Sequence, residues 1–96
     1  MGKNINIPTV DFLFEAILSL ENKDECYNFF EDLCTVAELL EMSKRMLAAK
    51  MLYENHIYSE IAEVTGLSTA TISRVSRCLK YGKDGYTTVL GRILEK

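Results

Sequence analysis

The segment from Tyr58 to Tyr81 constrains the fold of this 96-residue chain more than any other part of it. Two helices that cross at close range need a small residue on the first helix, and Ala62 supplies one. A sharp end to that helix needs a left-handed backbone, which glycine adopts without a Cβ penalty, and Gly66 follows. Ser68 or Thr69 can then cap a second helix. The inward side of that helix would carry aliphatic residues at helical spacing, which are Leu67, Ile72, Val75 and Leu79.

The small residue, the glycine, the cap and the aliphatic stripe together predict a helix-turn-helix over residues 58–81. The rest of the chain also favours helices, because apolar residues recur three and four apart and no period-two alternation is sustained. Pro8 can open a first helix, and residues 22–25 and 35–38 resemble capping boxes for two more. We therefore expect an all-α fold of about six helices, the last over residues 84–95.

The charge of the chain differs in sign between its two halves. Residues 1–43 carry two basic and nine acidic side chains, a net charge of −7, whereas residues 44–96 carry nine basic and five acidic ones, a net charge of +4. Between Gly66 and Lys83 there are four basic residues and no acidic one. The asymmetry indicates an anionic partner for the second half, although a solvated helix face is the commoner origin of such a pattern.

The outward side of the predicted second helix suits the major groove of DNA. Short hydroxyl residues and Ala70 would let the helix backbone approach base edges and meet a thymine methyl group. Arg74 is long enough for a bidentate contact with guanine or for a phosphate, and Arg77 and Lys80 suit phosphates. The predicted DNA-binding residues are Ser59, Ser68, Thr69, Ala70, Thr71, Ser73, Arg74, Arg77 and Lys80.

Through Ser59–Glu63, Gly66 and Ala70–Arg74 above all, the sequence from about Glu38 onward resembles the Trp repressor superfamily, and most closely its small Trp-repressor-related YerC/YecD branch. The resemblance implies one domain over residues 1–96 that forms an intertwined homodimer, with residues 8–55 as the dimerisation part. Its two recognition helices would address adjacent major grooves of double-stranded DNA. The aromatic-rich first helices agree with this, because they carry more apolar surface than so small a bundle could cover alone. The residues that carry the resemblance are Ser59–Glu63, Gly66, Ala70–Arg74, Leu79–Lys80, Val89, Leu90, Ile93 and Leu94.

The same resemblance implies a candidate effector pocket. Tryptophan-responsive members of the family hold the indole between two arginines, of which the second falls on Arg74 and the first on Lys44, with Arg45 beside it. Lysine does not stack as a planar guanidinium does. In those members a glycine packs on the ligand and a serine helps to hold its amino group. The matching positions here are Val75 and Cys78. We therefore expect that tryptophan is not the ligand, and we hypothesise that Val75 occupies the space that tryptophan would fill. The protein would then either bind DNA constitutively or respond to another small effector.

These features predict a sequence-specific DNA-binding transcriptional regulator, a repressor, that acts as a homodimer. The alternative is a helix-turn-helix used for protein contact, and salt-dependent retention on DNA would separate the two. An enzyme is not expected, because His56 is the only histidine and there is no phosphate-binding loop or nucleophile motif.

Compartment and metal content follow from what the sequence lacks. Three cysteines without Cys-x-x-Cys spacing provide no zinc site, so no metal or cofactor is expected. No apolar stretch has the length of a membrane span, and no signal peptide is evident. We expect a cytoplasmic protein with reduced, mostly buried thiols.

Overall fold

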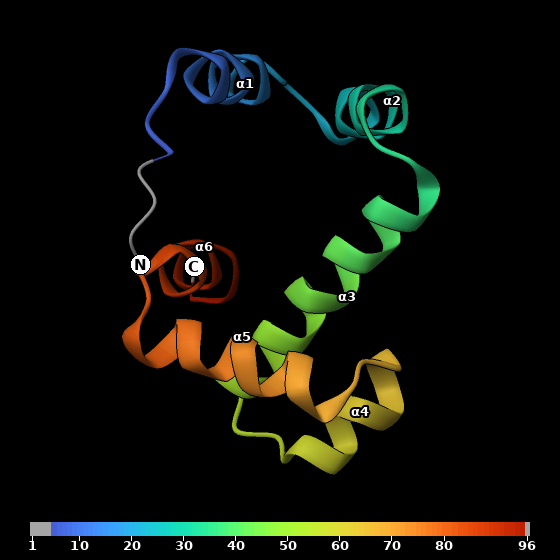
Figure 1. Ribbon diagram of the computed structural model, residues 1–96, viewed down its shortest axis with the longest axis vertical. Coiled ribbons are helices and arrows are strands. Elements are labelled where there is room, and N and C mark those ends of the chain that lie inside the picture. Colours follow the sequence, from blue (N-terminus) through green and yellow to red (C-terminus); the bar gives the residue numbers. More distant parts are fainter. Residues whose placement is uncertain (1–4, 96) are drawn as a thin grey trace. The chain divides into compact units, whose positions relative to one another are not determined.

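The computed structural model describes residues 5–95 of the chain, which contain six helices and no strand. This confirms the all-α prediction. The chain divides into two compact units, Met1–Thr35 with the first two helices and Val36–Lys96 with the other four. The helices are α1 (Pro8–Leu18), α2 (Lys23–Leu33), α3 (Val36–Tyr53), α4 (Tyr58–Thr65), α5 (Thr69–Tyr81) and α6 (Gly85–Leu94) (Figure 1).

Both helices of the first unit begin where the sequence predicts a start. Pro8 is the first residue of α1, where its missing N–H is no loss. The Asn22 side chain caps α2 by accepting a hydrogen bond from the Glu25 backbone N–H at 2.9 Å. The Glu25 carboxylate in turn accepts from the backbone N–H of Glu21, one residue before the cap. The expected capping box is therefore present in a shifted form.

The helix-turn-helix is confirmed as α4, a short turn and α5. Gly66 ends α4 with a left-handed φ of 76°, and its N–H donates to the Ala62 carbonyl at 2.8 Å. A Cβ at Gly66 would meet no atom within 4 Å. The turn therefore requires glycine for its backbone conformation and not for lack of space. The side chain of Ser68, one of the two caps that the sequence offers, caps α5.

Thr65 ties the end of α4 to the turn. Its hydroxyl donates to the Ile61 carbonyl at 2.7 Å and accepts from the Leu67 backbone N–H at 3.1 Å. Thr65 is buried, so this hydroxyl has both a donor and an acceptor partner where water does not compete. The path of the chain into α5 is thereby fixed.

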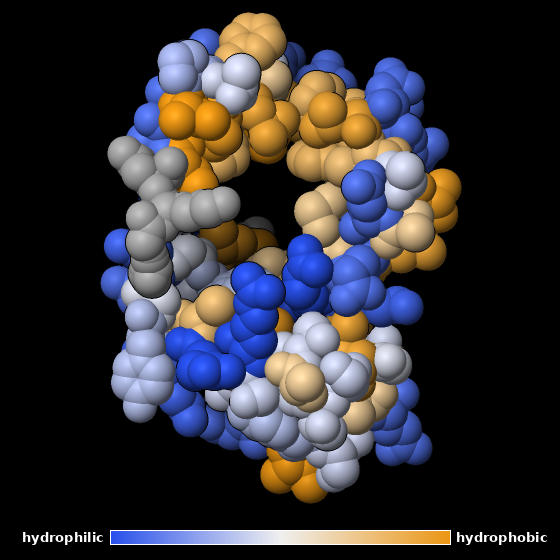
Figure 2. All heavy atoms as spheres, viewed as in Figure 1, coloured by the Kyte–Doolittle hydropathy of each residue, from blue (hydrophilic) through white to orange (hydrophobic). Residues whose placement is uncertain are grey.

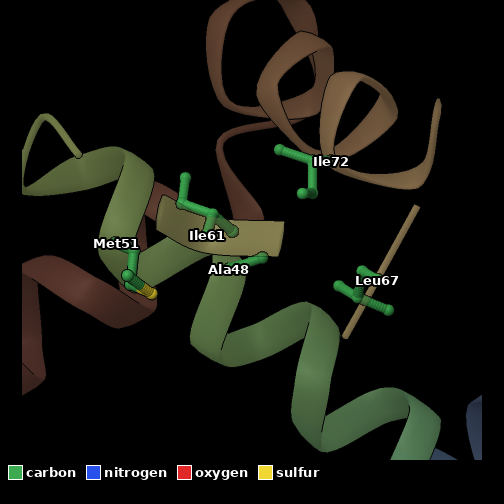
Figure 3. Close-up of a cluster of buried hydrophobic side chains, with 5 residues drawn as sticks. All are labelled: Ala48, Met51, Ile61, Leu67 and Ile72. Atoms are coloured by element: carbon green, nitrogen blue, oxygen red, sulfur yellow. The ribbon is translucent and has the colours of Figure 1, made fainter. Parts of the chain in front are cut away.

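Two groups of buried side chains hold the second unit together. The predicted inward stripe of α5 is confirmed, because Leu67, Ile72 and Val75 are buried and Leu79 packs half-buried on the second group. The second group joins α3, α5 and α6 through Ala49, Val75 and Leu90. The first group joins α3, α4, the turn and α5, and its side chains converge in Figure 3: Ala48, Met51, Ile61, Leu67 and Ile72.

α3 is the element on which α4, α5 and α6 all pack. Ala48 and Ala49 have no exposed surface, so the other helices approach the α3 backbone closely at these positions. Ala62, the small residue predicted on α4, packs partly buried against the first group. None of the helices in residues 5–95 has the length and apolar character needed to cross a lipid bilayer.

Alanine substitutions at two glycines should change stability in opposite directions. Gly66→Ala should lower the free energy of unfolding by about 1–2 kcal/mol, because a Cβ is strained in the left-handed conformation. Gly91→Ala in α6 should raise it by about 0.5–1 kcal/mol, since an added Cβ there meets no atom within 4 Å and alanine favours the helix. Urea unfolding followed by circular dichroism measures both. Changes of the same sign would contradict the role given to the turn.

Candidate nucleic-acid interface

The outward side of α5 carries most of the residues that the sequence predicts to bind DNA. Ser68, Thr69 and Ala70 are exposed at the start of the helix, and the basic residues are exposed further along it. Thr71 and Ser73 are half-buried. We call the outward surface of α5 the recognition face, and it consists of Thr69, Ala70, Ser73, Arg74, Arg77 and Lys80.

The orientation of the recognition face follows from what packs on the opposite side of α5. Ile72, Val75 and Ser76 are the buried residues of this helix, which packs on α3, α4 and α6. With about 3.6 residues per turn, Arg74 and Arg77 then point away from the core. The hydrophobic core therefore decides which side chains α5 offers to a partner.

The recognition face is electropositive, and its basic side chains are not engaged elsewhere. α5 contains Arg74, Arg77 and Lys80 and no acidic residue. Across residues 5–95, none of these three side chains forms an ion pair or a hydrogen bond. Figure 2 shows hydrophilic side chains gathered over α5. Free cations on one side of a helix are available to bind phosphates.

α4 has the opposite charge. It contains Glu60 and Glu63 and no basic residue. His56 precedes it with Nδ1 3.4 Å from Oε1 of Glu60 and Nε2 3.9 Å from Oε1 of Glu54. Ser59, the predicted DNA-binding residue outside the turn and α5, is exposed at the second position of α4. Within the helix-turn-helix, positive charge is therefore confined to α5.

Two of the predicted DNA-binding residues also stabilise the start of α5. The Ser68 hydroxyl accepts from the Thr71 backbone N–H and donates to Oγ1 of Thr71, both at 3.1 Å. The side chain of Thr69 forms no hydrogen bond with any described residue. The cap thus fixes the helix and leaves Thr69 and Ala70 free at the end that enters the groove in recognition helices.

A cavity of about 330 Å³ lies between α3, α5 and α6 and borders the recognition face, because Arg74 belongs to both. It brings together four of the five predicted effector-pocket residues, namely Arg45, Arg74, Val75 and Cys78. Lys44, the fifth, is exposed and is not one of the described residues that line the cavity. Two arginines, Arg45 and Arg74, therefore line this cavity. The family resemblance instead places Lys44 at the position of the first arginine.

Three further residues, which the sequence did not predict as pocket residues, also line this cavity. Glu41 stands one helical turn before Arg45, so a spacing of four residues was the available signal. Thr71 belongs to α5, where it was predicted only to bind DNA, and Tyr86 comes from α6. Val75 is 2% exposed and belongs to the core, and the cavity remains open beside it.

The expectation of mostly buried thiols is wrong. Cys26 and Cys34 are half-buried, and Cys78 is exposed where α5 borders the cavity. Neither α1 nor α2 contains a buried residue, which explains why apolar surroundings in the sequence did not translate into burial of Cys26. In the part of the chain that the structure describes, no three histidine, cysteine or acidic side chains gather as a metal site would require.

Known proteins share this arrangement over nearly the whole chain. The family described as Trp repressor protein matches residues 8–94. Protein YerC of Bacillus subtilis (strain 168), which is uncharacterized, is 51% identical over 86 residues, covering 90% of this chain and 83% of that protein. The crystal structure of a TrpR-like protein from Eubacterium eligens ATCC 27750 has a TM-score of 0.89 at 55% identity, covering 93% of this chain and 92% of that one.

A second solved structure is that of a candidate Trp repressor from Staphylococcus aureus. It has a TM-score of 0.88 at 49% identity, and the match covers 93% of this chain and 89% of that one. The family match runs from the start of α1 to the end of α6 and includes the whole helix-turn-helix. Both the sequence and the fold are therefore shared, and the chain belongs to the Trp repressor family of DNA-binding transcription regulators.

Proposed function

We propose that this protein is a sequence-specific repressor of transcription that binds double-stranded DNA as a homodimer, with α5 in the major groove. The observation that carries the proposal is the recognition face, where three cations without an intramolecular partner stand on an acid-free helix. Membership of the Trp repressor family supports it. No residue set on the recognition face suggests a reaction, and the family fold is that of a regulator and not of an enzyme.

The recognition face divides into two parts by side-chain length. Thr69 and Ala70 are short, so the start of α5 can approach base edges, and Arg74 is placed one turn further to reach a guanine. Arg77 and Lys80 lie towards the other end of the helix, where long cations suit phosphates. Base contacts would then select the sequence while phosphate contacts fix the position of the protein on the duplex.

Arg74→Ala and Lys80→Ala should weaken DNA binding in different ways. On a site obtained by binding-site selection, which should be two-fold symmetric, Arg74→Ala should cost about 1–3 kcal/mol for each half-site and relax preference at one base pair in each half-site. Lys80→Ala should weaken all sequences equally. Because it removes one cation from each protomer of the dimer, it should reduce the slope of log K against log salt by about 1.8, which corresponds to two phosphates. Fluorescence anisotropy at several salt concentrations measures both.

Lys23→Ala, which removes the same charge from the start of α2, is the matched control and should leave the affinity unchanged. Equal losses from Arg74→Ala and Lys80→Ala, with no change of base preference, would contradict the division of roles. An affinity for DNA that does not respond to salt would favour a helix-turn-helix used for protein contact.

Uncovered apolar surface supports the homodimer. In the first unit Phe12 is 72% and Leu18 is 83% exposed, and no residue of α1 or α2 is buried. Apolar side chains are visible on the surface of both helices in Figure 2. Monomeric proteins rarely expose large contiguous apolar patches to water. A second copy of the chain offers the same uncovered helices and is the occupant that we propose for this surface.

The second unit carries an apolar groove that fits the same proposal. It has a volume of about 320 Å³ between α3 and α6, and Leu47 and Ile93 on its walls are 39% and 55% exposed. Leu90 and Leu94 of α6 continue the apolar lining. Apolar helices of the second copy would remove this surface from water, at roughly 25 cal/mol for each Å² buried.

Leu47→Glu and Ile93→Glu should convert the dimer to a monomer of 10.9 kDa, because each places a carboxylate in a mostly apolar groove that the second copy would have to bury. Val64→Glu, on the exposed surface of α4 outside the groove, is the matched control and should leave a dimer. Sedimentation equilibrium measures the mass of each variant. A dimer that survives both groove substitutions would exclude the groove from the interface.

A regulator switched by a small effector is a second candidate function, and the arginine-lined cavity favours it. We expect this effector not to be tryptophan, since Val75 and Cys78 replace the glycine and serine that the ligand would need. Isothermal titration calorimetry of the full chain with L-tryptophan should show no binding in the micromolar range. Saturable heat with a 1:1 stoichiometry per chain at micromolar concentration would overturn this expectation.

A further inference from the structure

A second cavity, of about 460 Å³, lies on another side of α5 and shares no lining residue with the arginine-lined one. It is bounded by the end of α3, the loop before α4, the second half of α5 and the start of α6. Its volume falls within the range of about 300–1,000 Å³ typical of sites for small molecules. We propose that this cavity binds a small organic carboxylate with an apolar or aromatic body.

Ser76 is the residue that points to a ligand. It is 7% exposed and lines the cavity, and its hydroxyl has no hydrogen-bond partner among the described residues. In residues 5–95, every side-chain nitrogen or oxygen that is fully enclosed has a hydrogen-bond partner, so an atom without a partner is not fully enclosed. The Ser76 hydroxyl is therefore not sealed in the core but opens into the cavity. Thr65, the other buried polar residue, has both of its hydrogen bonds supplied by the protein.

The charge at the Lys80 end of the cavity favours an anion there. Lys80 stands at its edge without an ion-pair partner, and no carboxylate group is among the described residues that line it. His56 on the opposite side already lies between the carboxylates of Glu54 and Glu60. The Ser76 hydroxyl and the Lys80 ammonium group are thus donors that await an acceptor. A carboxylate has two acceptor oxygens, which can take both hydrogen bonds.

Two neighbouring hydroxyl groups already have protein acceptors. The Tyr53 hydroxyl donates to the Glu95 carboxylate, and this hydrogen bond raises the pKa of Tyr53 above its ordinary value. The Thr87 hydroxyl donates to the Asp84 carbonyl at 3.2 Å. Ser76 therefore differs from both in having a hydroxyl hydrogen that no protein group accepts.

The larger part of the remaining cavity wall is apolar, although Asn55 and Tyr58 also line it. Leu52 and Leu79 pack half-buried against the core groups and present the rest of their side chains to the cavity, next to the ring of Tyr53. A bare inorganic anion would leave this wall in water. A carboxylate that carries an aromatic or branched aliphatic body would cover the wall and reach Ser76 and Lys80 with its charged end.

Occupancy of the cavity would affect DNA binding through Lys80. That residue belongs to both the cavity and the recognition face, so a bound carboxylate competes with a phosphate for the same ammonium group. The ligand would therefore weaken binding to DNA, and DNA would weaken binding of the ligand by the same factor. This coupling rests on the proposed function, whereas the ligand site itself does not.

Titration of the full chain with sodium benzoate, followed by ¹H–¹⁵N NMR, tests the site. Saturable shifts are expected at the amides of Ser76, Leu79 and Lys80 and not at those of Glu41 and Arg45, which line the other cavity. Benzyl alcohol at the same concentrations, which lacks the carboxylate, should bind at least about tenfold more weakly, because a hydrogen bond to a charged group contributes about 1.5–3 kcal/mol.

Ser76→Ala should weaken benzoate binding by about tenfold or more for the same reason. Ser19→Ala, the same change at an exposed serine of the first unit, is the matched control and should leave the affinity unchanged. The spectrum without ligand reports whether each variant is folded. Lys80→Gln replaces the ammonium group with an uncharged amide on a side chain one atom shorter, and should reduce the preference for benzoate over benzyl alcohol.

The absence of saturable shifts with benzoate, or equal affinities of the native chain and Ser76→Ala, would overturn the proposal. Equal saturation by inorganic phosphate at the same amides would also overturn it, because the cavity would then hold a phosphate of the duplex. Anisotropy with the selected DNA should show at least about fivefold weaker binding in saturating benzoate. Unchanged DNA affinity would overturn the coupling alone, and no DNA binding at all would overturn the proposed function while leaving the benzoate result valid.

Discussion

The close packing of helices on the second half of α3 is the constraint on which the rest of the second unit depends. Ala48 and Ala49 have no exposed surface, so α4 and α5 on one side and α5 and α6 on the other approach the same stretch of backbone. A larger side chain at either position would push these helices apart. The rotation of α5 about its axis follows from this packing, and with it the identity of the side chains on the recognition face.

The electrostatic character of the site is separate from this packing. The basic residues of the helix-turn-helix all stand on α5, while Glu60 and Glu63 make α4 acidic. A duplex that approaches α5 would therefore meet cations on one helix and repulsion from the other, which limits the orientations in which the protein can bind. A chain with a net charge of −3 can in this way present a surface that attracts DNA.

Local signals predicted the helix-turn-helix and its caps, because each depends on a few neighbouring residues. The left-handed Gly66, the Ser68 cap and the stripe through Ile72 and Val75 are all found where the sequence placed them. The candidate site was predicted less completely. Whether Lys44 or Arg45 reaches the cavity depends on the rotation of α3 about its axis, and Tyr86 belongs to α6, which is distant in sequence. Local spacing therefore could not predict that Arg45 and Tyr86 line the same cavity. The exposure of Cys78 depends on the same packing.

The hydrogen bonds at the start of α5 separate folding from recognition. Ser68 and Thr71 use their hydroxyl groups on each other and on the backbone, whereas Thr69 and Ala70 between them are exposed and unpaired. Exchanges at these two positions alter the surface offered to a partner with little change in the free energy of folding. Relatives with the same scaffold can therefore acquire new target preferences during evolution through a few substitutions, without first gaining stability elsewhere.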